Sequence, residues 1–133
     1  MLTPPPDSEI IEWPTSRMWF QDGIVYAISK KGDRSLEETK EMLETFKELV
    51  RKELGDEKVC LLIDVTNSPE TPRDIRDYAA EEFPKIVKAI AMISESALGK
   101  MVANLFFTIK TQPYPTRFFN SEKEAKKWLQ QYL

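Results

Sequence analysis

A polar loop in the middle of the chain contains the side chains best suited to chemistry. An apolar run over residues 59–63 ends at Asp64, and a helix is predicted to begin near Pro72. Open α/β folds usually place ligand-binding or regulatory groups where a strand ends and a helix begins. The polar side chains at this point are Asp64, Thr66, Asn67, Ser68 and Thr71.

Two interpretations of this loop are open. A phosphate added to it would be stabilised by the free N–H groups and the dipole of the following helix, which makes the loop a candidate phosphorylation or partner-docking site. In the other interpretation, the same side chains only form the turn and cap hydrogen bonds of an ordinary connection between a strand and a helix.

A second group of candidates lies on a helix predicted over residues 96–110. The start of this helix could hold a phosphate or carboxylate headgroup, although Ser96 is also explained as an ordinary N-cap. The helix is apolar on more than one side, so the excess apolar residues either line a ligand cavity, form an interface or pack in a core. The candidates are Ser96, Lys100, Met101, Leu105 and Phe107.

The composition excludes several classes of function. The 133-residue chain contains no histidine, which removes Ser-His-Asp catalysis, Cys-His catalysis and histidine-based zinc sites. Its four glycines are scattered singly, so it has no glycine-rich phosphate loop. A net charge of −3 offers no basic footprint for nucleic acid. We therefore expect a non-enzymatic protein with no cofactor, no metal and no nucleic-acid partner.

Cysteine content and hydropathy indicate the compartment. Cys60 is the single cysteine, and its apolar surroundings predict a buried, inert thiol. No segment reaches the roughly 18 apolar residues of a transmembrane helix. The first nine residues lack the basic and apolar regions of a signal peptide. These features predict a cytoplasmic protein without a transmembrane segment.

The first part of the chain predicts a hairpin and a long helix. Asp22-Gly23 separates β-prone runs at residues 16–21 and 24–29, which is a strong hairpin signal. Ser35 and Glu38 then form a capping box that opens a helix. This helix ends at a glycine, Gly55. Its apolar stripe consists of Leu36, Thr39, Leu43, Phe46, Val50 and Leu54.

The remaining pattern alternates strands and helices. Residues 59–65 and 86–93 are unalternating apolar strands, as expected where both sheet faces are covered. Residues 116–119 form a last short strand, and Ser121 with Glu124 caps the final helix. The predicted order is β-β-α-β-α-β-α-β-α, an α/β domain with a mixed, mostly parallel sheet covered by helices.

The N-terminal residues are predicted to lie outside this domain. Three successive prolines exclude helix and ladder pairing over residues 1–9. We divide the chain into an N-terminal arm, residues 1–14, and a domain, residues 15–133. We expect Ile10, Ile11 and Trp13 to anchor the arm on the domain or on a second subunit.

Four runs of the sequence resemble the STAS fold of anti-sigma-factor antagonists and of the related SEC14-like, lipid-binding group. They are DGIVYAI (22–28), LLIDVTNSP (61–69), VKAIAMISESALGKMVANLFF (87–107) and PTRFFNSEKEAKKWL (115–129). The nearer match is to small uncharacterised bacterial proteins with this fold. The resemblance implies a STAS-like single domain over most of residues 16–133.

The resemblance also implies two functions. One is a regulatory or protein-binding module that acts through a protein partner or self-association, because anti-sigma antagonists are phosphorylated on a serine before their second helix. Their serine-glycine signature is replaced here by Asn67-Ser68-Pro69, so Ser68 and Thr71 are the acceptors by position. The alternative is a protein that binds a lipid or another small apolar ligand in a cavity beside the helix at 96–110.

Overall fold

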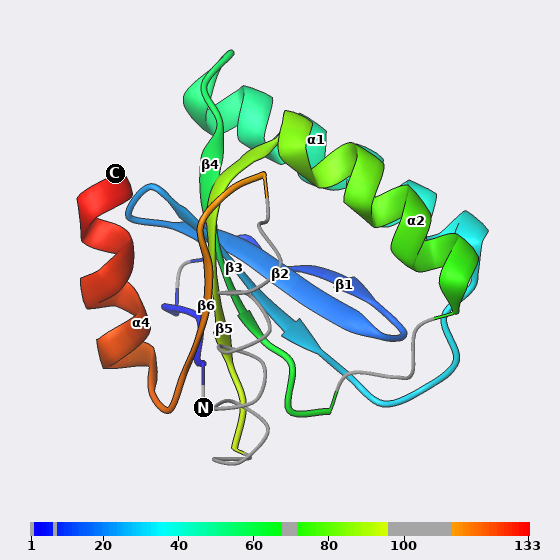
Figure 1. Ribbon diagram of the computed structural model, residues 1–133, viewed down its shortest axis with the longest axis horizontal. Helices are drawn as coiled ribbons and strands as arrows, with labels where there is room; N and C mark the ends of the chain where they lie inside the picture. The colour runs from blue at the N-terminus through cyan, green and yellow to red at the C-terminus, as the bar shows by residue number, and fades with distance from the viewer. Residues whose placement is uncertain (1, 7, 68–71, 96–112) are drawn as a thin grey trace.

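A mixed β-sheet runs through the centre of the molecule and has helices on both faces (Figure 1). The computed structural model describes residues 2–6, 8–67, 72–95 and 113–133. Within these residues the sheet has six strands in the order β1-β2-β3-β4-β5-β6. The first three strands pair antiparallel, and β3 to β6 pair parallel. This architecture confirms the predicted mixed, mostly parallel α/β domain.

The described elements other than β1 follow the predicted boundaries within one or two residues. The strands are β1 (Ile11–Trp13), β2 (Ser16–Gln21), β3 (Ile24–Ser29), β4 (Val59–Asp64), β5 (Val87–Ile93) and β6 (Thr116–Phe119). The helices are α1 (Leu36–Leu54), α2 (Arg73–Glu82) and α4 (Glu122–Leu129), with short 3-10 turns η1 (Phe83–Lys85) and η2 (Gln130–Tyr132).

The β2–β3 hairpin forms where the sequence predicts it. Asp22 and Gly23 both have positive φ, at 53° and 81°, as the two central residues of a type I′ turn require. The turn fixes the register, so Gln21 pairs with Ile24 and Ser16 pairs with Ser29 at the far end.

The α1 helix also forms as predicted. The Ser35 side chain accepts a hydrogen bond from the Glu38 backbone N–H at 3.0 Å, and Gly55 ends the helix with a φ of 68°. Four members of the predicted apolar stripe are buried against the sheet: Thr39, Leu43, Phe46 and Val50.

The sheet separates two hydrophobic cores. In β4, Cys60 and Leu62 point to the α4 face, whereas Val59 and Leu61 point to the face covered by α1 and α2. Both faces of this strand are therefore buried, which explains its unalternating apolar sequence. Cys60 is fully buried, as predicted, and burial raises the pKa of its thiol.

The strand β1 was missed in the predicted element order. It is a three-residue edge strand that pairs Ile11 with Met18 and Trp13 with Ser16. Its signal is weak because the run is short and is followed at once by Pro14. Ile11 and Trp13 pack against the core under α1 and α2, so they anchor the N-terminal residues as predicted, whereas Ile10 is 40% exposed and does not. The division at residue 14 and a second subunit remain predictions.

Candidate functional site

A pocket of about 510 Å³ lies between the sheet and the helices α1 and α2. Its floor is formed by apolar residues of four strands: Met18, Ala27, Leu61, Ile63 and Met92. Its opposite wall is formed by apolar residues of the two helices and of η1: Met42, Leu43, Phe46, Ile75, Ala79 and Phe83. Pockets of 300–1,000 Å³ with mostly apolar walls are typical binding sites for small molecules.

The polar side chains of the pocket include two neighbouring serines. Ser16 and Ser29 face each other across the β2–β3 hairpin and are only 4% and 3% exposed. No group in the described part of the chain hydrogen-bonds to either hydroxyl. Neither hydroxyl is among the fully buried, unpartnered polar atoms of the described residues, so both border the open space of the pocket.

An arginine also lines the pocket. Arg34 lies in the connection between β3 and α1, where its Nε donates to Thr15 Oγ1 at 3.1 Å and its Nη2 donates to the Thr15 carbonyl at 2.9 Å. Burial lowers the pKa of the guanidinium, and the carboxylate of Glu38 opposes this effect. Arg34 is therefore a partly desolvated cation that lines the pocket and is fixed in position by Thr15.

The two helices of the pocket wall are joined by an ion-pair cluster. Glu82, near the end of α2, accepts hydrogen bonds from Lys47 of α1 and from Lys85 of η1, both at 2.7 Å. The Glu82 side chain is 11% exposed. The two lysines lower the pKa of Glu82 from its ordinary 4.5 to about 2, and Glu82 in turn raises the pKa of both lysines.

This cluster makes the stability of the pocket wall dependent on pH. Because the pKa of Glu82 is lower in the folded chain, its carboxylate stabilises the fold above about pH 4.5 and loses this effect as the pH falls towards 2. We expect Glu82→Gln to lower the melting temperature at pH 7, and the difference from wild type to shrink between pH 4.5 and 2. Circular dichroism melts across this range measure it.

The neighbouring residue supplies the control for this prediction. Glu81 is exposed, so Glu81→Gln removes the same charge without breaking the cluster, and we expect it to change the melting temperature little. A difference between Glu82→Gln and wild type that stays constant from pH 7 to pH 2 would contradict the assigned role of Glu82.

The predicted polar loop is only partly described. Asp64 is buried, and its Oδ1 accepts a hydrogen bond from the Thr66 backbone N–H at 2.9 Å. This is the contact expected of an aspartate that forms a turn. Thr66 and Asn67 are exposed. Ser68 and Thr71 lie outside the described residues, so phosphorylation of this loop remains a prediction.

The candidates on the predicted helix at 96–110 also lie outside the described residues. They are Ser96, Lys100, Met101, Leu105 and Phe107, and a cavity beside that helix remains a prediction. The pocket formed by the described residues lies instead beside α1 and α2.

The pocket residues Ser16, Ser29 and Arg34 were missed from the sequence. A signal for the serines was available, because a two-residue Asp-Gly turn fixes the register that places Ser16 opposite Ser29. Two serines opposite each other on the buried face of a hairpin indicate a local polar site within an otherwise apolar core. No comparable local signal exists for Arg34, whose position depends on the path of the loop before α1.

The described residues contain neither a cluster of metal-ligating side chains nor a membrane-spanning helix. Among residues 2–6, 8–67, 72–95 and 113–133, no three acidic or cysteine side chains come together as a metal site would require. None of the helices described there has the length and apolar character needed to cross a bilayer.

The fold is similar to that of a solved protein. The crystal structure of an uncharacterized protein from the DUF3478 family with a SpoIIAA-like fold, from Shewanella loihica PV-4, superposes with a TM-score of 0.56. The two sequences are 16% identical, and the match covers 92% of this chain and 91% of that chain. This likeness confirms the predicted STAS-like fold and carries no function with it.

The sequence comparisons place the chain in a family. No curated protein matches the sequence. The sequence model of a family described as a domain of unknown function, DUF7793, matches residues 18–133. This range includes all of the described elements except β1 and the first residues of β2. The chain therefore belongs to the DUF7793 family and has a STAS-like fold.

Proposed function

We propose that this protein is a non-enzymatic binding module that holds a small apolar ligand between α1, α2 and the sheet. The observation that supports it is the pocket of about 510 Å³. Most of the residues that line this pocket have apolar side chains. Release of water from such walls is the main driving force for binding an apolar molecule. The non-enzymatic part of the proposal rests on the sequence, which has no histidine.

The pocket walls support a ligand site more strongly than a packing defect. The floor belongs to β2, β3, β4 and β5, which are joined by continuous ladders. The opposite wall belongs to α1 and α2, which the Glu82 cluster holds together. A pocket between two well-supported walls stays open without a ligand, so little binding energy is lost to reorganisation.

A substitution that fills the pocket tests the proposal. Ala79 is a half-buried residue of α2 that lines the pocket. We expect Ala79→Phe to reduce the affinity for the neutral fluorescent probe N-phenyl-1-naphthylamine at least tenfold. The melting temperature should stay the same or rise, because the new ring occupies empty space. Fluorescence titration and thermal melts measure the two effects.

The next residue of α2 is the matched control. Ala80 is exposed and lies outside the pocket, so Ala80→Phe adds the same ring without filling it. It should leave probe binding unchanged. The proposal fails if the wild-type protein does not bind the probe, or if the two variants bind it equally well.

A further inference from the structure

We infer that the pocket selects an amphiphile with one apolar chain and a carboxylate head, and that Arg34 binds this head with the help of the two buried serines. The inference rests on the proposed function and names the class of ligand. The apolar tail would lie along the pocket towards Ile63, Met92 and Phe83.

The charges of the pocket walls favour an anion. Among the described residues that line it, the charged ones are Arg34 and Arg76, and none is an aspartate or a glutamate. This local excess of positive charge occurs in a chain whose net charge is −3. A cation next to an apolar cavity is unfavourable unless anions compensate it; Glu38 offsets part of this cost, and a ligand carboxylate in the pocket offsets more.

The guanidinium of Arg34 is held in place and retains free donors. Thr15 accepts from its Nε and its Nη2, which fixes the plane of the group. A guanidinium has five N–H donors, so three remain for a ligand. Because Thr15 has already ordered the side chain, an incoming carboxylate gains hydrogen bonds at a small further cost in entropy.

The serines give an independent indication of a polar ligand group. Ser16 and Ser29 are both more than nine-tenths buried, both line the pocket, and neither hydroxyl has a partner within the described ranges. Each hydroxyl can donate one hydrogen bond. Two hydroxyl donors and a guanidinium among the residues that line the pocket match the several lone pairs of a carboxylate.

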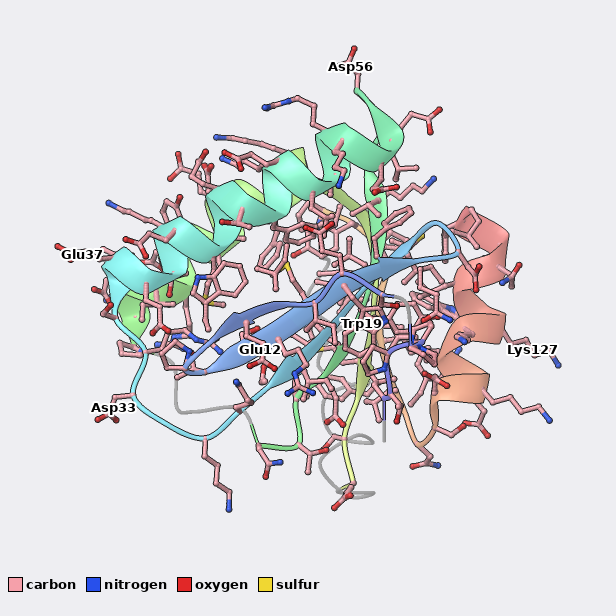
Figure 2. The ribbon with its side chains drawn as sticks, turned by 180° about the vertical axis from the view of Figure 1, so that it is seen from behind. Glu12, Trp19, Asp33, Glu37, Asp56 and Lys127 are labelled. Carbon is pink, nitrogen blue, oxygen red and sulfur yellow. The ribbon has the colours of Figure 1, made fainter. Side chains whose placement is uncertain are left out.

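The surroundings of Arg34 favour a singly charged head over a phosphate. Glu38 lies within electrostatic range of Arg34. Asp33 and Glu37 stand beside it in the sequence and point away from the body of the molecule at the start of α1 (Figure 2). The Glu38 carboxylate, unlike the outward-pointing Asp33 and Glu37, would repel a doubly charged phosphate at Arg34 more strongly than a singly charged carboxylate. A fatty acid therefore fits better than an alkyl phosphate.

Three ligands that share one alkyl chain and differ in their head group test the inference. Decanoate, decanol and decyl phosphate are titrated against the full chain by displacement of N-phenyl-1-naphthylamine. We expect decanoate to bind about tenfold more tightly than decanol, as charged hydrogen bonds provide. Arg34→Met should remove this advantage, so that decanoate binds no more tightly than decanol. Arg34→Lys, which keeps the charge and loses the planar fork, should restore part of it.

Two further variants separate binding from folding. Arg51→Met removes an exposed arginine of α1 outside the pocket and should leave the preference for decanoate intact. Ser29→Ala deletes one hydroxyl with little change in volume and should weaken decanoate binding a few-fold, even if Arg34→Met fails to fold.

The outcomes distinguish this inference from the proposed function. Equal affinity for decanoate and decanol, unchanged in Arg34→Met, overturns the inference and leaves an apolar site. Tighter binding of decyl phosphate than of decanoate overturns the choice of a carboxylate. Failure of the probe and of all three ligands to bind overturns the proposed function itself.

Discussion

Replacing Trp19 with alanine is expected to lower the free energy of unfolding by about 3–5 kcal/mol. Trp19, on the strand next to the edge strand β1, is fully buried in the core on the α4 face (Figure 2). Its ring stacks on that of Tyr26 across the hairpin, with ring centroids 5.5 Å apart and planes 10° apart. Its Nε1 donates to Gln21 Oε1 at 3.2 Å. Alanine removes the stack and leaves a cavity that rigid strands cannot close.

Such a loss would be a large share of the 5–15 kcal/mol that stabilises a typical domain. Urea unfolding followed by circular dichroism measures this free energy. The slope of the free energy of unfolding against urea concentration should be the same as in wild type if the folded and unfolded states keep their compactness. Trp19→Phe keeps an aromatic ring against Tyr26 and should cost less. Trp13→Ala removes a half-buried ring at the sheet edge and is the second control. Equal losses for Trp13→Ala and Trp19→Ala would contradict the role assigned to the buried ring of Trp19.

The same substitution separates the roles of the two faces. The α4 face is densely packed, with Trp19, Tyr26, Leu62 and Leu129 each less than 2% exposed. The pocket lies on the opposite face, under α1 and α2. A Trp19 variant that still folds should therefore bind the fluorescent probe like wild type. One core stabilises the sheet, and the other leaves space that a ligand can fill.

Local signals in the sequence were sufficient for the described elements other than β1. The Asp22-Gly23 turn, the Ser35 cap and the Gly55 stop each depend on a few neighbouring residues, and each forms as predicted. The unalternating run of β4 correctly indicated a strand covered on both faces. In each case one physical requirement, such as positive φ or an unsatisfied N–H, allows few residue types.

The pocket could not be predicted in the same way, because it depends on contacts between distant parts of the chain. Lys47 and Glu82, which join its helical walls, are 35 residues apart. The side chain of Arg34 is held at the pocket by hydrogen bonds to Thr15, which lies 19 residues earlier in the chain. Neither pair has a fixed spacing that a periodic pattern would reveal. The predicted site at Asp64 was instead identified from its residue types, and these also suit a turn.

Deleting residues 1–14 is expected to destabilise the domain on both faces of the sheet. Leu2 is 3% exposed and belongs to the core on the α4 face. Ile11 and Trp13 of β1 pack on the other core, so the N-terminal residues contact both sides of the sheet. Loss of Leu2 alone is worth about 2–5 kcal/mol, as for other buried leucines. The melting temperature should therefore fall by on the order of 10 °C.

The deletion should also promote self-association. Without β1, the strand β2 becomes the sheet edge, and its backbone N–H and C=O groups towards β1 lose their partners. Exposed edges of this kind pair with other chains. Light scattering at increasing protein concentration measures the effect. Deletion of residues 1–9 keeps β1, so it should lower the melting temperature through Leu2 without promoting association.

Point variants distinguish the buried anchors from the surface contacts of the same segment. Leu2→Ala should reproduce most of the loss seen on deletion of residues 1–9. Glu9 Oε2 lies 3.4 Å from Lys52 Nζ, but both side chains are largely exposed. Glu9→Gln should therefore change the free energy of unfolding by less than about 1 kcal/mol. An unchanged melting temperature after deletion of residues 1–14 would show that neither Leu2 nor β1 holds the sheet. A loss in Glu9→Gln equal to that in Leu2→Ala would assign the anchoring to the ion pair instead.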